Sequence, residues 1–368
     1  MKTRVRKATM TNKERVEALL RRENPDRVPF LAGGQSFAVI RSGGTIADRY
    51  HAMYDTGTTG NYSRKMVYEA EKRACREFDW VFAPTILSRQ NRGAFGGEVK
   101  LPTNKYSQGA FVTKYAAETP EEVMALKVPD VKACFTPEMI DFYKWVYEDE
   151  DENKAFVSMN GPSFNTVAGI AGYDTLCKWM LKEPEAAYRL VRLAADYEIA
   201  TAQYFKELFS MEKVIPLGAS AAASNQLISP KHFEQFALPY MKELHQKLLA
   251  MGFKHLCHHP CGEHNLNLPY WQQVPMGDPG IVWFGNEVDL ATGANYFPND
   301  IIEGNLDTTV IQCGTPEEVY QEARKVIEQG KSLPTGFILR PACELPPYAP
   351  VENIKAITRA LNDFGWYD

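Results

Sequence analysis

Eight short runs of apolar, β-branched or aromatic residues recur along the chain, and this repetition constrains the fold more than any other feature. Amphipathic stretches with helical spacing separate most of the runs, for example residues 185–209 and 233–251. A strand followed by a helix, repeated eight times, is the pattern of a (β/α)8 barrel. The sequence therefore predicts an α/β fold of the TIM-barrel type. The predicted strands are residues 28–32, 80–86, 156–160, 214–218, 254–259, 281–286, 302–306 and 336–340.

Two helix starts carry the same local signal, and both support the predicted boundaries. Residues 119–122 and 315–318 each read threonine, proline, glutamate, glutamate. This order puts a capping threonine first, proline at the first helical position and glutamate at the third. We interpret both as capping boxes with a purely structural role.

Residues 88–154 form a segment that is too long for one connection between a strand and a helix. The glycines at 93–97 and the turn residues at 106–109 predict a small hairpin inserted after the second strand, near the barrel mouth, where it could form part of a lid. Residues 1–27 are expected to form a helical lead-in. Because no repeat or linker divides the sequence, residues 1–368 are expected to form a single domain.

Composition narrows the classes of function. The 368 residues are 45% hydrophobic and carry a formal net charge of −5, which gives no basic footprint for nucleic acid. Seven widely spaced cysteines, an odd number, indicate reduced thiols in a reducing compartment. The basic start of the chain has no apolar core behind it, and no apolar run approaches the roughly 18 residues of a membrane helix. We therefore expect a soluble, cytoplasmic protein.

Residues 254–262 concentrate the chemistry of the chain. Side chains alternate along a strand, so Cys257, His259 and Cys261 are expected to share one face while His258 points away. Imidazole nitrogen and thiolate sulfur are the ligands that Zn²⁺ prefers, and catalytic zinc keeps three protein ligands and one exchangeable position. The alternative for these residues is a buried cysteine beside a hydrogen-bonded histidine.

The chain resembles the uroporphyrinogen decarboxylase superfamily along nearly its whole length. The resemblance rests on the order and spacing of short motifs: TNKERV at 11–16, PDRVP at 25–29, NGP at 160–162, LISPKHF at 227–233, LPY at 238–240, GNLD at 304–307 and PVEN at 350–353. Within this superfamily, zinc-dependent, corrinoid-linked methyltransferases are marked by His-x-Cys and a distant third cysteine. His259, Cys261 and Cys343 look like that set.

The resemblance implies that His259, Cys261 and Cys343 hold a catalytic zinc ion at the carboxyl ends of the fifth and eighth strands. Glu287, at the end of the sixth strand, matches the place where some relatives put a fourth, exchangeable ligand; the alternative is an acid at a helix start. The chain lacks an Asp-x-His-x-x-Gly pattern for corrinoid, so a partner corrinoid protein is expected to dock at the barrel mouth. The sequence leaves open whether two copies of the chain form a homodimer.

Decarboxylation is the less favoured alternative. True uroporphyrinogen decarboxylases carry early arginines that would pair with the carboxylates of a tetrapyrrole. Here the corresponding residues 31–37 contain no arginine, and the next arginine along the chain is Arg41. Asp79, which lies near the family's catalytic aspartate, is as well explained as a hydrogen-bonding residue at the barrel mouth.

Two methyltransferase reactions remain, and the ligand set does not separate them. Zinc can stabilise the oxygen that leaves a methyl ether, or it can activate a thiol such as coenzyme M. Aromatic residues at predicted strand ends and first loops favour a methoxylated ring, so we predict O-demethylation of phenyl methyl ethers, with methyl transfer to thiols as the alternative. Arg340 is the possible anion-binding residue for a sulfonate. The predicted substrate-binding residues are Phe30, Trp80, Asn160, Phe164, Trp283, Asn305 and Asp307.

Overall fold

Seven parallel strands form the central sheet of the protein. The structure, a computed structural model, describes residues 6–54, 62–86, 93–103 and 109–367. The strand order is β1-β4-β5-β6-β7-β8-β9, and each strand pairs in parallel with the next. The strands are β1 (Thr85–Ile86), β4 (Val157–Asn160), β5 (Val214–Ala219), β6 (Cys257–His259), β7 (Ile281–Trp283), β8 (Ile301–Leu306) and β9 (Phe337–Pro341).

The first predicted strand closes this sheet into a barrel. The Leu31 N–H donates to the Leu339 carbonyl at 3.0 Å, and the Leu339 N–H donates to the Pro29 carbonyl at 2.9 Å. On the other side, the Phe30 carbonyl accepts a 2.8 Å hydrogen bond from the Val81 N–H, just before β1. Residues near 28–32 therefore bridge β9 and the second strand. This confirms the predicted (β/α)8 barrel with its eight strands.

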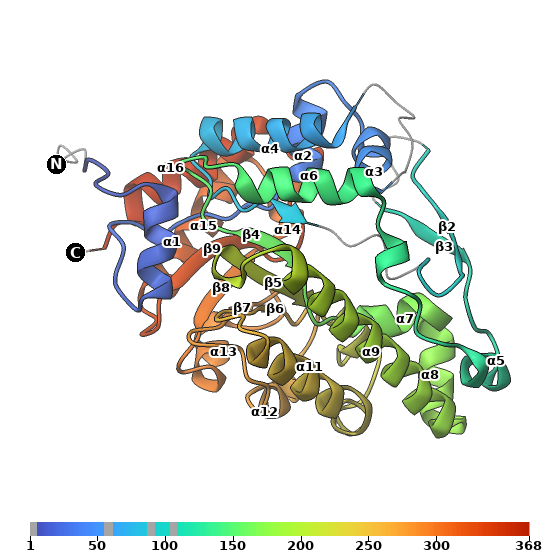
Figure 1. The fold of residues 1–368 in the computed structure, drawn as a ribbon. Helices are drawn as coiled ribbons and strands as arrows, with labels where there is room; N and C mark the ends of the chain where they lie inside the picture. The colour runs from blue at the N-terminus through green and yellow to red at the C-terminus, as the bar shows by residue number, and fades with distance from the viewer. Residues whose placement is uncertain (1–5, 55–61, 87–92, 104–108, 368) are drawn as a thin grey trace.

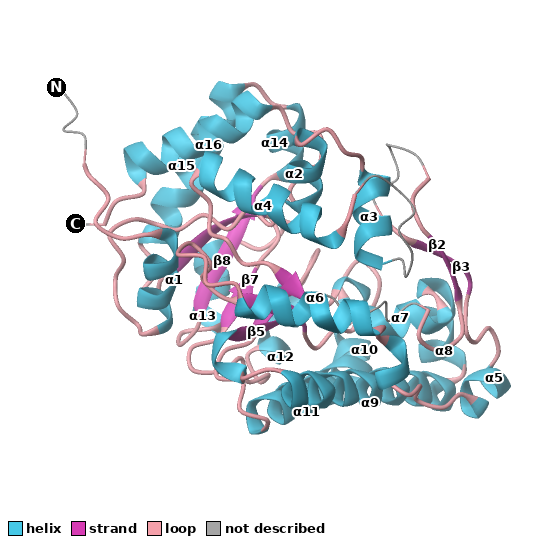
Figure 2. Cartoon of the chain, turned by 45° about the horizontal axis from the view of Figure 1, so that its top comes forward, coloured by secondary structure: helices cyan, strands magenta, loops and turns pink. Residues whose placement is uncertain are grey.

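Helices surround the strands, as Figure 1 and Figure 2 show. The described helices are α1 (Asn12–Leu20), α2 (Gln35–Arg41), α3 (Ile46–Tyr54), α4 (Arg64–Phe78), α5 (Pro120–Ala125), α6 (Pro137–Glu148), α7 (Asn165–Ala171), α8 (Tyr173–Lys182), α9 (Pro184–Leu208), α10 (Pro230–His232), α11 (Leu238–Ala250), α12 (Leu268–Trp271), α13 (Leu290–Tyr296), α14 (Thr308–Cys313), α15 (Pro316–Lys331) and α16 (Val351–Phe364). The predicted helix at 233–251 begins with a π-helical turn at Phe233–Ala237. Within the described parts of the chain, no helix is both long and apolar enough to cross a membrane.

Two hydrophobic cores follow from this architecture. The smaller core fills the barrel interior with one or two side chains from each strand, among them Leu31, Phe156, Ile281 and Ile338. The larger core lies between the outer faces of the strands and the helices. Strands buried on both faces read as continuous apolar runs, which explains why the runs were visible in the sequence.

A two-stranded antiparallel hairpin lies between β1 and β4 in the chain. It consists of β2 (Glu98–Lys100) and β3 (Phe111–Lys114), and the predicted glycine turn at 93–97 leads into β2. The predicted turn residues 106–108, and Ser88 at the start of the insertion, lie outside the described residues. Figure 1 places the hairpin beside α3 and away from both chain termini. A role as a lid stays a prediction.

Both predicted capping boxes are present. The Thr119 and Thr315 hydroxyls accept the backbone N–H of Glu122 and Glu318, and each glutamate carboxylate accepts the N–H of its threonine. These contacts satisfy amide groups that the first helical turn would otherwise leave unpaired.

We expect Thr315→Ala to lower the free energy of unfolding by about 1 kcal/mol, because the start of α15 loses its side-chain acceptor. Urea denaturation followed by circular dichroism measures this loss. Thr315→Ser keeps the hydroxyl and is the matched control, which should stay close to the wild type. Equal stability of the alanine and serine variants would contradict the capping role.

Candidate metal centre and adjoining cavity

Strand β6 presents its side chains alternately, as its sequence predicts. Cys257 lines a cavity inside the barrel, whereas His258 points outward, where its Nε2 lies 3.0 Å from the Ser220 hydroxyl and its ring packs on Trp271. Burial holds the pKa of His258 well below its usual range, so this ring is neutral. His259 follows at the carboxyl end of the strand, which is the rim where barrel chemistry is placed.

His259, Cys261 and Cys343 come together at this rim. One ligand atom from each side chain, an imidazole nitrogen and two Sγ atoms, lies within 4.8 Å of the others. His259 is buried, Cys261 is half-buried and Cys343 is exposed. The three side chains predicted from their spacing and from the family resemblance are thus neighbours, and the cluster faces solvent on one side.

The His259 ring is held in one tautomer and one orientation. Its Nδ1 lies 2.7 Å from the Trp283 carbonyl oxygen, and because a carbonyl only accepts, Nδ1 carries the proton. The other nitrogen, Nε2, is buried and has no hydrogen-bond partner among the described residues. The His259 ring also stacks on the Trp283 indole, with 3.7 Å between the two ring centroids. A fixed tautomer with a free lone pair fits a metal ligand, and it disfavours the alternative of a hydrogen-bonded structural histidine.

The two thiols are electrostatically coupled. The hydrogen bond from Cys261 and the nearby His259 ring lower the pKa of the Cys343 thiol. The same contact with Cys343, together with burial and the carboxylate of Glu287, raises the pKa of Cys261. The pair of thiols therefore loses its first proton readily and its second with difficulty while no cation is near. A bound dication would stabilise both thiolates.

Glu287 lies close to the cluster but is not one of its three members. It is exposed in the turn after β7, and its carboxylate lies against Gly285. Asn305 holds this turn: its side-chain amide donates to the carbonyls of Gly285 at 3.1 Å and Val288 at 2.9 Å. Asn305, predicted to bind substrate, therefore positions the segment that carries Glu287.

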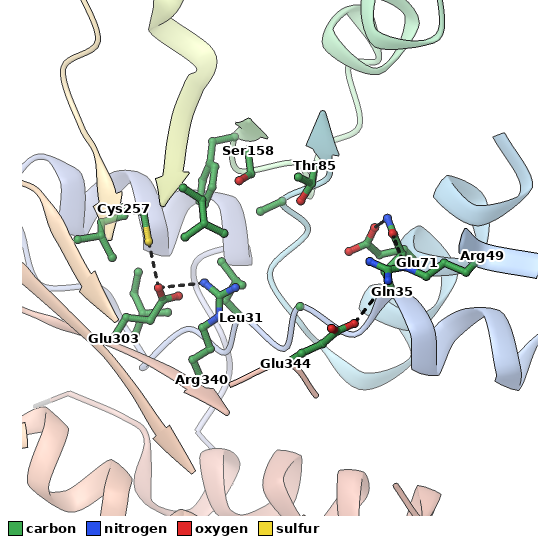
Figure 3. A pocket seen from close by; sticks show the side chains of 16 residues that line it. Leu31, Gln35, Arg49, Glu71, Thr85, Ser158, Cys257, Glu303, Arg340 and Glu344 are labelled. Carbon is green, nitrogen blue, oxygen red and sulfur yellow. Dashed lines mark hydrogen bonds and ion pairs between the residues drawn. The ribbon is translucent and has the colours of Figure 1, made fainter. Parts of the chain in front are cut away.

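A cavity of about 130 Å³ lies inside the barrel, and its lining includes Cys257 of β6 and Glu344, the residue after Cys343, but none of the three cluster residues. Leu31, Phe156, Ile281 and Ile338 give it an apolar floor that belongs to the barrel core. Figure 3 shows the polar side chains in two groups, with Ser158 and Thr85 between them. One group is Cys257, Glu303 and Arg340, and the other is Gln35, Arg49, Glu71 and Glu344.

The group around Glu303 connects the cavity to the cluster of His259, Cys261 and Cys343 through Trp283. Arg340 donates to the Glu303 carboxylate at 3.0 Å, and the Cys257 thiol donates to the same oxygen at 3.5 Å. The Arg340 guanidinium also lies 3.5 Å from the centre of the Trp283 ring. His259 and Arg340 both approach that ring centre closely, which is sterically possible only from opposite faces. The indole is therefore sandwiched between them.

The second polar group surrounds Arg49. Its guanidinium donates to Gln35 at 2.9 Å and lies 3.8 Å from the carboxylate of Glu344, the residue after Cys343. The Gln35 amide donates to Glu71 at 3.1 Å. Burial raises the pKa of Glu71 to about 7, so near neutral pH this carboxyl is only partly ionised.

The predicted substrate-binding residues fall in several places. Phe30, Trp80 and Phe164 pack in the outer hydrophobic core and do not line the cavity. Asn160 ends β4, and Trp283 supports His259.

Asp307 and Asp79 both act as helix-end residues. Asp307 caps the start of α14 and accepts a hydrogen bond from Asn286. Asp79 ends α4 ahead of the second strand, bonded to Asn12 and Arg27, which places it at the amino end of the barrel and not at the mouth.

Sequence reasoning missed the charged residues of the cavity, apart from Arg340. Glu303 carried a usable signal, since it is an isolated acid in the apolar run at 301–306 and is only 1% exposed. Arg49 and Glu71 lie on helices α3 and α4, where charged residues are ordinary. Nothing in their local sequence distinguishes them.

The loop after β4 is held by a buried acid on α9. Glu198 accepts hydrogen bonds from the Ser163 N–H at 2.8 Å and from the Thr166 hydroxyl. Burial raises the pKa of Glu198 to about 8. Ser163 in turn donates to the Ala219 carbonyl at the end of β5. Glu198 thus ties one loop of the barrel mouth to the surrounding helices.

The fold and the cluster define the class: a (β/α)8 barrel with a candidate metal centre at the carboxyl ends of its strands. The uroporphyrinogen decarboxylase (URO-D) family model matches residues 11–364, and the chain belongs to this family. The predicted family resemblance is confirmed.

Two relatives and one solved structure show which proteins the chain is similar to. The chain is 31% identical over 205 residues to the methylated-thiol–coenzyme M methyltransferase of Methanosarcina mazei, a match that covers 54% of this chain and half of that relative. It is 24% identical over 359 residues to the methylcobamide:CoM methyltransferase of Methanosarcina acetivorans, covering 96% of this chain and 98% of the relative. A solved methyltransferase from Methanosarcina mazei superposes with a TM-score of 0.74 at 19% identity, covering 96% of this chain and 99% of the other, which supports the barrel fold.

We expect about one Zn²⁺ per chain, and we expect Cys261→Ala or Cys343→Ala to lose most of it, because three protein ligands hold the ion. Metal analysis after dialysis measures this. Cys257→Ala is the matched control: Cys257 lies on β6, the strand that carries His259, but outside the cluster, so this variant should keep its metal. Affinity should fall on acidification, as protons compete for sulfur and imidazole. Unchanged metal content in the Cys261→Ala/Cys343→Ala double variant would refute the site.

Glu198 gives a pH prediction. The folded protein keeps a proton on this carboxyl up to about pH 8, whereas an unfolded glutamate releases it near its ordinary pKa of about 4.3. The stabilising contribution of Glu198 is therefore complete below about pH 4.3 and is lost as the pH rises towards 8. Glu198→Gln should flatten this fall between pH 5 and pH 8 in urea denaturation. Glu207→Gln, an exposed position on α9, should leave it unchanged. A fall in wild-type stability over this range that Glu198→Gln leaves unaltered, or no fall at all, would contradict the assignment.

Proposed function

We propose that this protein is a corrinoid-dependent methyltransferase that transfers a methyl group between a corrinoid on a partner protein and a small thiol. The observation that carries the proposal is the cluster of His259, Cys261 and Cys343 at the barrel rim, with the unpartnered Nε2 of His259. Such a donor set fits zinc with an exchangeable position. When bound there, Zn²⁺ would hold the sulfur of a thiol and lower its pKa.

The protein's own residues prepare the reaction geometry. Trp283 fixes the His259 ring through its carbonyl and its indole, and Asn305 holds the turn that carries Glu287 beside the cluster. The exposed edge at Cys343 leaves the cluster open towards the barrel mouth, where a corrinoid protein could dock. The apolar floor of the cavity limits water around the reacting sulfur.

The reaction balances without an external oxidant or reductant. The thiol loses its proton to solvent, and its sulfur forms a bond to the methyl carbon. The bond between cobalt and that carbon breaks, and both electrons stay on cobalt, which passes from methyl-Co(III) to Co(I). The products are a methyl thioether and the reduced corrinoid on the partner.

Two observations favour a thiol over the phenyl methyl ether that the aromatic residues predicted. The relatives described above are named for thiol or coenzyme M substrates, and one of them aligns with almost the whole chain. Among the described residues that line the cavity, Phe156 is the one aromatic side chain. The walls are therefore not the flat aromatic surfaces on which the ether prediction depended. O-demethylation of aryl ethers stays a prediction that the same assay tests.

The cavity also argues against a tetrapyrrole substrate. A space of about 130 Å³ suits a molecule of a few heavy atoms. Arg41, the first arginine after residues 31–37, pairs with Glu77 at the surface and does not line the cavity. Decarboxylation of a multiply charged acid has little support from these residues.

We expect the zinc-loaded protein to convert methylcobalamin and a small thiol into cob(I)alamin and a methyl thioether, because the cluster activates sulfur. The change in the cobalamin spectrum and mass spectrometry of the thioether measure it. Cys343→Ala should reduce the rate by about a hundredfold or more, as loss of a group that acts on the reacting atoms does, while Cys313→Ala, an exposed cysteine outside the cluster, should not. Methylation of reduced cobalamin by aryl methyl ethers, with no thiol methylated, would contradict the proposal.

A further inference from the structure

The charges around the cavity compensate one another. Arg340 pairs with Glu303 at 3.0 Å, and Arg49 lies 3.8 Å from Glu344. Glu71 is the third carboxyl group in the described lining. Because its pKa is about 7, it carries a fraction of a negative charge near neutral pH. Among the described lining residues, no arginine is left without a carboxylate partner. The lining therefore carries zero to one negative charge.

Three buried polar atoms of the described lining residues lack a partner: the Arg340 Nε–H, one oxygen of Glu303 and the Ser158 hydroxyl. Glu303 is 1% exposed, and its Oε1 has no hydrogen-bond partner among the described residues, although Oε2 has two. Ser158 is 4% exposed, and its hydroxyl is likewise unpartnered. Buried polar groups normally have partners, and an unmet carboxylate oxygen is costly. A molecule in the cavity could supply the missing hydrogen bonds.

We propose that this cavity selects a thiol whose tail is uncharged or positively charged and donates a hydrogen bond to Glu303. Hydroxyl and ammonium groups have this chemistry, and the Ser158 hydroxyl is placed to add a second contact. The inference rests on the proposed function, since it names the substrate class of the same site. The inferred substrate differs in the charge of its tail from coenzyme M, the thiol in the names of the relatives, because coenzyme M ends in a sulfonate.

An anionic tail fits the cavity poorly for an electrostatic reason. A sulfonate would need a cation, but both guanidinium groups already share their charge with carboxylates. The Arg340 Nε–H is also unpartnered, yet that guanidinium lies over the Trp283 ring and donates a hydrogen bond to Glu303. Binding would leave at least one buried negative charge uncompensated, which is strongly unfavourable.

A panel of thiols of similar length tests the inference. The zinc-loaded protein would be offered 2-mercaptoethanol, 2-aminoethanethiol, 3-mercaptopropionate and 2-mercaptoethanesulfonate, with methylcobalamin as methyl donor. We expect kcat/KM for the neutral and cationic thiols to exceed that for the anionic ones by about tenfold or more. Calorimetric binding of the same thiols without methylcobalamin should give the same order, independently of turnover.

A charge change at Glu303 should reverse the preference. Glu303→Gln removes the carboxylate and frees the charge of Arg340, so the ratio of sulfonate to aminothiol should rise by about tenfold. Glu77→Gln, which removes a carboxylate from the surface pair with Arg41, is the matched control and should not alter the ratio. If Glu303→Gln fails to fold, Ser158→Ala tests the same cavity and should weaken binding of 2-mercaptoethanol.

The outcomes are distinguishable. A wild-type preference for the sulfonate, in rate or in binding, would overturn the inference and leave the proposed function intact. Absence of methyl transfer to every thiol would refute the proposed function, and the calorimetric order of binding would then still decide the inference about the cavity.

Discussion

Closure of the parallel barrel is the constraint on which the site depends. Hydrogen bonds between residues 29–31 and β9, and between Phe30 and Val81, complete the ring of strands. In a closed parallel ring every strand delivers its carboxyl end to the same rim. Cys343, just after β9, can therefore meet His259 and Cys261 at the end of β6, although they are far apart in sequence. His259 and Cys261 alone would supply two ligands, and Cys343 alone would supply one.

Trp283 joins the two halves of the site. Its carbonyl fixes the tautomer of His259, one face of its indole supports the same ring, and the other face carries Arg340. Arg340 in turn pairs with Glu303 in the cavity wall. The orientation of the His259 ring and the charge of the cavity are thus linked through one buried side chain. A hydrogen bond from the indole to the Pro341 carbonyl keeps that side chain in place.

The sequence was informative where one local pattern determines the outcome. The eight apolar runs predicted the strands because both faces of a barrel strand are buried, and alternation correctly separated His258 from His259. The role of Phe30, Trp80 and Phe164 was not predictable in this way. An apolar side chain at a strand end can face the outer helices or the barrel mouth, and its local sequence is the same in both cases. The structure places these three in the outer core.

The charge pairs of the cavity were also beyond the sequence. Glu303 and Arg340 belong to adjacent strands separated by α14 and α15, and Arg49 reaches Glu344 from a helix near the start of the chain. Such pairs depend on register and side-chain direction across the closed barrel, which no spacing rule encodes. The sequence therefore predicted that His259, Cys261 and Cys343 come together, through motif and resemblance, but not the polarity of the cavity.

We propose that two cysteines and one histidine hold a metal ion with a position open to sulfur. X-ray absorption spectroscopy at the zinc edge measures this most directly, because it counts sulfur neighbours. The account predicts two sulfur ligands in the protein alone and three after a small thiol is added, with one imidazole in both states. A spectrum with no sulfur neighbours, or with a sulfur count that does not change when the thiol binds, would contradict it.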